Sequence, residues 1–316
     1  MRVLVTGGAG FIGSHLVSAL SREGHAVVVL DNFNSFYAPS LKLANVSSFA
    51  RQVKVVEGDV CCSATVDALF DRWCFDSVIH LAAYAGVRSS IRHQTLYLKT
   101  NIGGTLQLLR AASRMGVSKF LFGSSSSVYG PREKVPFSEG MALSRTLNPY
   151  AASKLAAERL CRDFAQLWGI RVVCLRFFTV YGPAQRPDLA IHKFTRSILK
   201  EVPLQKFGDG TTQRDYTYID DVVQGILKAL YYNEGGTFEV FNLGKNSATT
   251  LNELIATIEE VLGKRAVIRT LPEQNGDMLY TCADVSKACR LLGYQPQVTI
   301  PIGIKKFVSW YLEKMR

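Results

Sequence analysis

The chain opens with an apolar strand that enters a glycine-rich turn, Val3-Leu4-Val5-Thr6-Gly7-Gly8-Ala9-Gly10-Phe11-Ile12-Gly13. The turn leads into a helix expected at Ser14–Arg22, and a second apolar strand, Ala26–Leu30, ends on Asp31. Glycine permits the tight turn and lets the backbone approach a pyrophosphate, whose charge the N–H groups and dipole of the helix attract. The pattern predicts a dinucleotide site in which Gly7, Gly10, Phe11, Ile12 and Gly13 contact the cofactor.

Asp31 favours NAD as that dinucleotide, with Asn32 beside it. Its carboxylate can accept hydrogen bonds from both ribose hydroxyls, whereas its charge would repel the 2′-phosphate of NADP. Asp59 and Val60 follow the third expected strand, where an acid often faces the adenine edge; a plain turn aspartate is the alternative. The cofactor would also contact Leu81, Ala82 and Ala83, because small residues at the carboxyl end of the fourth strand let it lie close.

Strands and helices alternate through the first half of the chain, which predicts an α/β fold with a parallel, doubly wound sheet of the Rossmann type. Further strands are expected at Val53–Glu57, Ser77–Leu81, Lys119–Phe122 and Arg171–Phe177, with helices at Leu96–Met115 and Tyr150–Trp168. After Phe178, proline and glycine separate shorter elements, with helices expected at Ile191–Lys200, Asp220–Tyr231, Leu251–Leu262 and Pro301–Glu313. We therefore expect residues 1–177 to form the cofactor domain. Residues 178–316 should build mainly a smaller α/β substrate lobe, with some segments returning to the first domain.

The charge balance is basic: 37 Lys and Arg against 26 Asp and Glu give a formal charge of +11. The basic residues are spread along the chain rather than gathered in a stripe, so we expect no nucleic-acid partner. An anionic nucleotide substrate would benefit from the charge. No run of about 18 apolar residues is present, so we expect no membrane span.

The cysteines point to a compartment rather than to a metal. Seven are scattered along the chain without the paired spacing of a zinc site, so no metal is expected. An odd, scattered set favours the reducing cytoplasm. Met1 lies so close to the first strand that no signal or transit peptide is expected.

A tyrosine and a lysine are placed for proton transfer in Tyr150-Ala151-Ala152-Ser153-Lys154. Residues four apart on a helix share one face. Tyrosine titrates near 10, so it is a poor base at neutral pH unless a nearby ammonium and a nicotinamide cation stabilise the phenolate. The pair can then remove a hydroxyl proton as hydride leaves the same carbon. An amphipathic helix without catalytic residues is the alternative.

Four serines, Ser124 to Ser127, end the fifth expected strand. A hydroxyl at that place can hydrogen-bond the reacting oxygen and present it to the tyrosine, and Ser125 is our choice. A serine-rich turn that satisfies its own backbone is the alternative.

These residues together resemble the extended short-chain dehydrogenases/reductases, in particular the nucleotide-sugar epimerase/dehydratase group, over essentially the whole chain. The resemblance assigns cofactor or catalytic roles to the glycine turn, Asp31, Ser125, Tyr150 and Lys154. It also implies that Arg214, in Arg214-Asp215-Tyr216, meets the diphosphate of a UDP-sugar. Galactose-type epimerases carry an arginine three residues before an aspartate near the end, and that arginine touches the diphosphate. Here Gln274 takes its place before Asp277, so we expect Asp277 to contact the substrate but Arg214 to be the clearer diphosphate ligand.

Narrower matches resemble the UDP-glucuronate 4-epimerases within this group. They lie in Ala82–Arg88, Ser124–Gly130, Arg176–Pro183 and Arg186-Pro187-Asp188. The resemblance implies inversion of C4 through a 4-keto sugar. Because that ketone makes the C5 carboxylate prone to leave as carbon dioxide, hydroxyls that hold the carboxylate would oppose its loss. Ser126, Ser127 and Thr179 are candidates for this role.

Two arginines add charge to the expected substrate site. Arg186, and less surely Arg88, either supplement the carboxylate contacts or hold the nucleotide phosphates. Rival readings are a UDP-N-acetylhexosamine or UDP-galactose 4-epimerase, a UDP-glucuronate decarboxylase, and a non-catalytic NAD-sensing or RNA-binding relative. Thr179 and the serines disfavour the other 4-epimerases. The absence of the glutamate that decarboxylases usually carry disfavours a decarboxylase, and the intact Ser125, Tyr150 and Lys154 disfavour a non-catalytic relative.

The resemblance also implies a homodimer. The helices expected at Leu96–Met115 and Tyr150–Trp168 have apolar faces, and in this family such helices pair across a two-fold axis as a four-helix bundle. Packing of both faces on the sheet is the alternative.

Overall fold

A parallel sheet of seven strands forms the centre of the larger lobe in the computed structural model, which describes residues 1–131, 134–143, 145–273 and 278–315. The strand order is β10-β6-β5-β4-β1-β2-β3, with all neighbours parallel. The strands are β1 (Arg2–Thr6), β2 (Ala26–Asp31), β3 (Lys54–Glu57), β4 (Ser77–His80), β5 (Lys119–Ser125), β6 (Arg171–Phe177) and β10 (Phe238–Leu243). The predicted doubly wound sheet is confirmed, and its switch point lies between β1 and β4.

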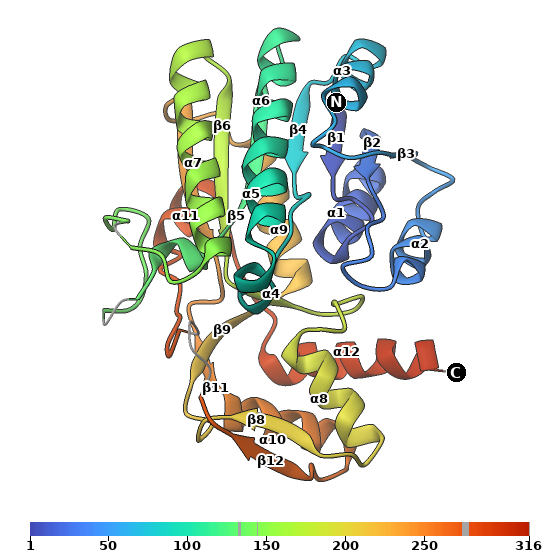
Figure 1. The fold of residues 1–316 in the computed structure, drawn as a ribbon, viewed down its shortest axis with the longest axis vertical. Helices are drawn as coiled ribbons and strands as arrows, with labels where there is room; N and C mark the ends of the chain where they lie inside the picture. Colours follow the sequence, from blue (N-terminus) through green and yellow to red (C-terminus); the bar gives the residue numbers. More distant parts are fainter. Residues whose placement is uncertain (132–133, 144, 274–277, 316) are drawn as a thin grey trace.

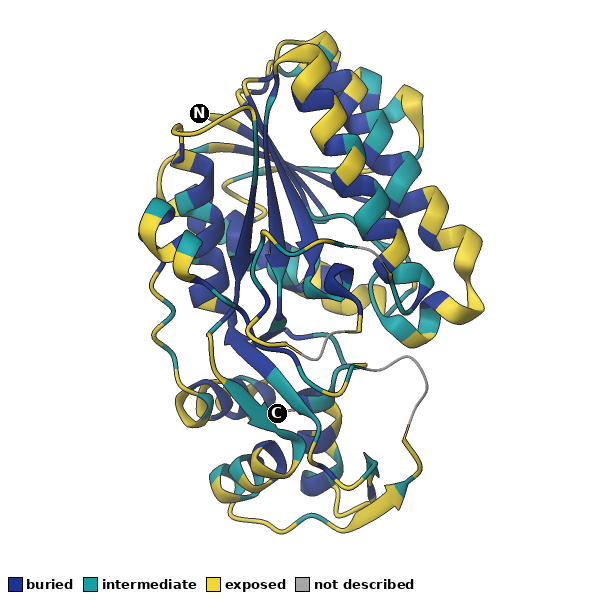
Figure 2. Ribbon diagram, turned by 90° about the vertical axis from the view of Figure 1, so that its left-hand side faces the viewer, coloured by how far each residue is buried: buried dark blue, intermediate teal, exposed yellow. Residues whose placement is uncertain are grey.

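Helices cover both faces of this sheet (Figure 1). One face carries α3 (Ser63–Arg72), α6 (Thr105–Arg114) and α7 (Pro149–Trp168), and the other carries α1 (Phe11–Arg22), α9 (Ile219–Tyr231) and α11 (Ser286–Leu292). Successive strand residues alternate between the two cores, with Val3 and Val5 in one and Leu4 in the other. Since both faces are buried, the strands form near-continuous apolar runs, and Figure 2 shows them buried along their length.

The single helix expected at Leu96–Met115 is wrong in detail. The structure has α5 (Gln94–Leu98), a π-helical turn η1 (Lys99–Gly104) and then α6. Two glycines end η1, and the side chain of Asn101 within it bonds both backbone polar groups of Tyr84. A π turn accommodates one extra residue, and such turns are frequent at functional sites. The apolar spacing that predicted the helix carries no information on such an insertion.

The smaller lobe is built from segments after Phe178 and lies below the carboxyl ends of the strands in Figure 1. Its sheets pair β7 (Thr179–Tyr181) with β9 (Gln213–Tyr218) and β11 (Ala248–Thr250), and β8 (Leu204–Phe207) with β12 (Ile268–Leu271). Its helices are α8 (Ala190–Leu199), α10 (Leu251–Leu262) and α12 (Ile300–Met315). Three elements from this half of the chain, α9, β10 and α11, return to the larger lobe.

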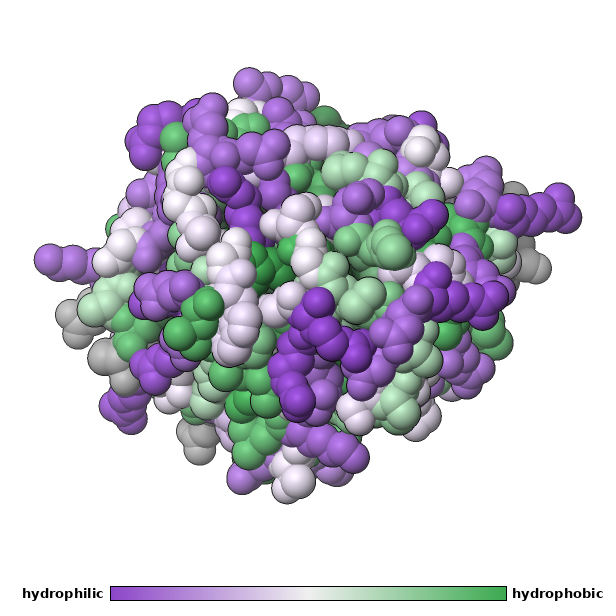
Figure 3. All heavy atoms as spheres, turned by 90° about the horizontal axis from the view of Figure 1, so that it is seen from above, coloured by the Kyte–Doolittle hydropathy of each residue, from purple (hydrophilic) through white to green (hydrophobic). Residues whose placement is uncertain are grey.

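Polar and apolar residues mix on the surface of the larger lobe, where Figure 3 shows them interspersed over its end. Across the described residues, no helix has the length and apolar character that a bilayer crossing requires. The same residues contain no cluster of His, Cys, Asp and Glu arranged to hold a metal ion.

Candidate active site

A cleft of about 1220 Å³ lies at the carboxyl ends of the large-lobe strands and extends toward the smaller lobe. Most of the residues predicted from the sequence line it: Gly7, Gly10, Phe11, Ile12, Gly13, Asp31, Asn32, Val60, Leu81, Ala82, Ala83, Arg88, Ser125, Ser126, Ser127, Tyr150, Lys154, Thr179, Arg186 and Arg214. Asp59 does not line the cleft but bonds Asn32, which does. Asp277 lies outside the described residues.

The glycine turn forms a cradle that side chains would fill. A Cβ on Gly13 would lie 2.2 Å from the Gly7 carbonyl oxygen, and one on Gly7 would lie 2.7 Å from the Ala82 nitrogen. Gly7 also has φ +72°, a conformation that glycine adopts without strain. Gly10 precedes α1 and has no side chain to cap it, so the first N–H groups of the helix are available to an anion.

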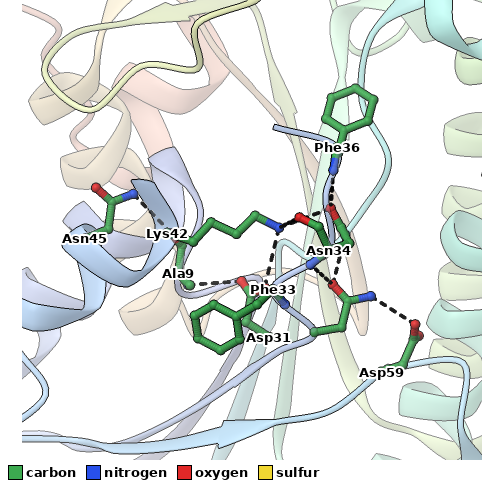
Figure 4. A network of polar contacts seen from close by, with 9 residues as sticks. Ala9, Asp31, Phe33, Asn34, Phe36, Lys42, Asn45 and Asp59 are labelled. Carbon is green, nitrogen blue, oxygen red and sulfur yellow. Dashed lines mark hydrogen bonds and ion pairs between the residues drawn. The ribbon is translucent and has the colours of Figure 1, made fainter. Parts of the chain in front are cut away.

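Asp31 lies in a polar network at the end of β2 (Figure 4). One carboxylate oxygen accepts from Ala9 N at 3.1 Å and the other from Phe33 N at 3.0 Å. The ammonium of Lys42, from α2 (Pro39–Ser47), lies 3.8 Å from the second oxygen and donates to the backbone and side-chain oxygens of Asn34. The backbone therefore fixes the orientation of the carboxylate, and a buried cation lies against it.

The same network explains the position of Asp59. Its carboxylate accepts a hydrogen bond of 2.9 Å from the Asn32 amide and another from Cys61 N at 2.8 Å. Burial favours a higher pKa for Asp59, but these hydrogen bonds outweigh it and lower the pKa below its usual value. Asp59 thus holds Asn32 at the wall of the cleft as an anionic acceptor.

Sequence reasoning missed two residues of this region, Lys42 and Tyr37. Among the described residues, the Tyr37 hydroxyl is buried without a hydrogen-bond partner, 4.0 Å from the place of a Cβ on Gly10. Burial raises its pKa to about 12, so it remains a donor at neutral pH. A buried donor without a partner beside the glycine turn fits a pyrophosphate oxygen. Neither residue was signalled, because residues 32–48 have no periodic pattern.

The three proposed catalytic side chains, Ser125, Tyr150 and Lys154, all line the cleft. Within it, Tyr150 and Ser125 lie beside each other. Desolvation raises the pKa of Tyr150, while Ser125 and the charge of Arg186 lower it. The ammonium of Lys154 donates to the Gly123 carbonyl at 2.6 Å, and burial lowers the pKa of Lys154 to about 8. In this arrangement Tyr150 is protonated at neutral pH, and added positive charge would ease its deprotonation.

The serines at the end of β5 have different partners. Ser124 donates to a carboxylate oxygen of Glu158 at 2.5 Å. The Ser125 hydroxyl instead lies 3.1 Å from the Ser127 hydroxyl and accepts from Ser127 N. Because Ser124 is committed to Glu158 while Ser125 lies beside Tyr150, the geometry favours Ser125 as the hydroxyl that reaches the reacting oxygen.

Asn101 ties the strand-β4 loop to α7. Its amide nitrogen donates to the Tyr84 carbonyl at 3.0 Å and to the Ser153 hydroxyl at 2.9 Å. Its amide oxygen accepts from Tyr84 N. Ser153 immediately precedes Lys154, so Asn101 holds together the π turn, the cleft wall and the helix that carries Tyr150 and Lys154.

Basic residues gather where the cleft extends into the smaller lobe. Arg186 donates to both oxygens of Asp188, at 2.9 and 2.8 Å, and its guanidinium lies 5.2 Å from the centre of the Phe36 ring. The guanidinium of Arg88 lies 4.8 Å from the centre of the Phe207 ring. The cleft is lined by Arg88, Lys193, Arg196, Arg214 and Arg186 on this side, of which Lys193 and Arg196 were not predicted. This surface suits a ligand with several negative charges.

A dinucleotide cradle that faces a serine, a tyrosine and a lysine at the ends of parallel strands defines an extended short-chain dehydrogenase/reductase. A model of the NAD dependent epimerase/dehydratase family matches residues 3–244. The chain belongs to this family. Its NAD requirement agrees with Asp31 and the glycine turn.

Three relatives show which members of the family this chain is similar to. UDP-glucuronate 4-epimerase 3 of Arabidopsis thaliana is 43% identical, over 98% of this chain and 76% of its own length. A crystal structure of the Bacillus cereus UDP-glucuronic acid 4-epimerase with UDP-glucuronic acid and NAD has a TM-score of 0.94 at 37% identity, covering 100% of both chains. A Thermotoga maritima UDP-glucose 4-epimerase with UDP-glucose has a TM-score of 0.93 at 34% identity, with the same coverage.

Proposed function

We propose that this enzyme interconverts UDP-glucuronate and UDP-galacturonate by inverting C4 with bound NAD. The single observation that carries the proposal is one cleft that joins Ser125 and Tyr150 to a strongly basic extension. A UDP-glucuronate has a diphosphate and a carboxylate, so its negative charges match that extension. Two of the three relatives above are named for UDP-glucuronate and support the choice.

The proton steps belong to Tyr150 and Ser125. Ser125 hydrogen-bonds O4 of the sugar. Tyr150 acts after it has lost its own proton: the phenolate removes the O4 proton, with Lys154 and Arg186 supplying positive charge near it. Bound NAD would supply the acceptor for the C4 hydride, and the hydride would return to the other face of the same carbon once the 4-keto sugar has turned over in the cleft. Gly7, Gly10 and Gly13 would hold its pyrophosphate with Tyr37, and Asp31 its adenosine ribose. Tyr150 returns the proton to O4, which completes the inversion.

The same site must keep the C5 carboxylate attached while C4 is a ketone. Decarboxylation requires the breaking C–C bond to align with the carbonyl π system and is helped by desolvation of the carboxylate. Ser126, Ser127 and Thr179 line the cleft and present hydroxyls suited to hold it out of alignment. Arg186 adds charge on one side. These contacts favour an epimerase over a decarboxylase.

A UDP-glucose or UDP-galactose 4-epimerase is the second candidate, because a Thermotoga maritima enzyme with UDP-glucose has nearly the same fold. The test is to incubate the purified protein with UDP-glucuronate and, separately, with UDP-glucose, and to identify the products by NMR. UDP-galacturonate from the first supports the proposal. Turnover of UDP-glucose alone establishes the second candidate, and a UDP-pentose indicates a decarboxylase.

We also propose that residues 1–177 supply the NAD site and residues 178–316 mainly the UDP-sugar site.

A cytoplasmic location is supported by seven free thiols.

The proposed assembly is a homodimer through α7 and the helices before it. A groove on α7 is lined by Ile102, Ala152, Leu155, Ala156 and Leu160, while Leu96 and Leu98 are 38% and 47% exposed. A two-fold contact would cover these apolar side chains. Light scattering should give twice the 35.0 kDa monomer mass, and a monomer mass at working concentration contradicts the dimer.

A further inference from the structure

A buried ion pair lies behind the catalytic residues, between β6 and α7. Arg176 donates from Nε to one Glu158 oxygen at 2.9 Å and from Nη2 to the other at 2.7 Å. The two side chains are 4% and 5% exposed. A buried ion pair often contributes no more stability than apolar residues of the same size. The position of this pair therefore calls for an explanation other than stability.

The pair bonds the strand that ends at the catalytic serine. The Glu158 oxygen that accepts from Arg176 Nε also accepts a hydrogen bond from the Ser124 hydroxyl, with 2.5 Å between the two oxygens. One turn earlier on α7, Lys154 donates to the Gly123 carbonyl. Consecutive residues of β5, immediately before Ser125, are thus bonded to the helix that carries Tyr150.

The other end of the pair holds the segment after Ser125. Arg176 Nη1 donates to the Tyr129 hydroxyl at 3.1 Å, and that hydroxyl donates to the Asn242 amide oxygen at 2.6 Å. Asn242 lies on β10 and donates to the carbonyls of Phe137 and Asp284. Tyr129 ends η2 (Ser126–Tyr129), the short helix that contains Ser126 and Ser127. The network therefore bonds residues on both sides of Ser125–Ser127.

We propose that Glu158 and Arg176 are positioning residues that fix the Ser124–Tyr129 segment so that Ser125 reaches Tyr150 and the sugar O4. The inference rests on the proposed function, because it assigns the pair to the same proton transfer. Neither side chain lines the cleft. Both act through Ser124 and Tyr129. The pair is placed to fix the orientation of Ser125 and its distance from Tyr150 rather than to exchange protons with the substrate.

The test begins with Ser124→Ala, which removes one hydrogen bond and leaves the ion pair intact. Because a displacement of about 1 Å can cost about 100-fold in rate, we expect kcat for UDP-glucuronate to fall about 10-fold, with KM changed by less than about threefold. The matched control is Ser118→Ala, since Ser118 precedes the same strand and bonds Asp76 O far from the cleft. It should retain wild-type kcat.

Charge and geometry are separated by Glu158→Gln and Arg176→Lys. Glu158→Gln keeps the shape of the acceptor but leaves a buried guanidinium without its counter-charge, and Arg176→Lys keeps the charge but loses the two-pronged geometry. Both should lower single-turnover hydride transfer more than Ser124→Ala does. Thermal unfolding and NAD content measure folding separately.

A crystal structure of Ser124→Ala provides a readout that needs no turnover. We expect the Ser125 hydroxyl to move away from Tyr150 while α7 stays in place. An unmoved Ser125, or variants whose lost activity merely follows their lost folded fraction, overturns the positioning role. A wild-type enzyme that does not convert UDP-glucuronate refutes the proposed function instead, and the displacement of Ser125 still decides the positioning role.

Discussion

Replacing Asp31 by Asn should shift the cofactor preference toward NADP, and Lys42 should be the reason. The carboxylate accepts from Ala9 N and Phe33 N, with the Lys42 ammonium 3.8 Å away. Asparagine has one acceptor oxygen, so it can satisfy only one of these two N–H groups. The substitution also leaves the buried ammonium without its nearest negative charge. The 2′-phosphate of NADP would then approach the Lys42 ammonium without the repulsion of the Asp31 carboxylate.

The size of the effect follows from these distances. Two unit charges about 4 Å apart interact by about 4 kcal/mol at an effective dielectric constant of about 20. The cleft is open to water, so we take about half of this as the net change for NADP. Each factor of ten in affinity is about 1.4 kcal/mol, which gives a gain of about 30-fold in NADP affinity and, together with the loss of NAD affinity, a shift of about 300-fold in the ratio of the two. NAD itself should bind about tenfold more weakly, since a charged hydrogen bond is lost.

The assay is isothermal titration of cofactor-free protein with each dinucleotide. Asp59→Asn is the matched control. It removes one negative charge from the same network, but the Asp59 carboxylate bonds Asn32 and is not expected to bind the ribose. It should weaken NAD without changing the ratio. Adding Lys42→Met to Asp31→Asn should abolish the gain for NADP. A ratio that changes less than about threefold in Asp31→Asn refutes the reasoning.

Three further outcomes follow from the site. Tyr150→Phe should retain NAD but lose more than about 1000-fold of turnover, and a loss below about tenfold, or 1.4 kcal/mol, would exclude it as the base. Thr179→Ala should release several-fold more carbon dioxide and UDP-4-keto-pentose per epimerisation, because a neutral hydrogen bond contributes about 0.5–1.5 kcal/mol; unchanged partitioning measured by NMR would make Thr179 a packing residue. Burial lowers the pKa of Lys154 from 10.5 to about 8, so the unfolded chain holds a proton that the folded chain lacks between these values, and folded stability rises with pH there. Lys154→Met should therefore flatten the rise in Tm of the cofactor-free protein across this window, and equal slopes would contradict the shift.

Local patterns carried most of what the sequence predicted correctly. The turn at Gly7–Gly13, the strand that ends on Asp31 and the spacing of Tyr150 and Lys154 each depend on neighbouring residues, so they could be recognised without a fold. The roles of these residues in turnover remain predictions, and Asp277 lies outside the described residues.

Contacts between distant segments could not be predicted. Lys42 approaches Asp31 only because α2 folds back over the glycine turn, and Glu158 meets Ser124 and Arg176 only when α7 packs across β5 and β6. The π turn within the helix expected at Leu96–Met115 was missed for the same reason. Asn101 bonds Tyr84, in the loop after β4, and Ser153, near the start of α7. The apolar periodicity of a single helix gives no information about contacts of this kind with other segments.

The strand order has a consequence for the order in which this protein can fold. The outer edge of β6 is covered by β10, a strand synthesised only after β7, α8, β8, β9 and α9. Until β10 arrives, the nascent chain presents an apolar parallel edge with unpaired N–H and C=O groups, which is a template for aggregation. Such long-range pairing also slows folding. A ribosome-bound fragment that stops at residue 177 should therefore depend on chaperones.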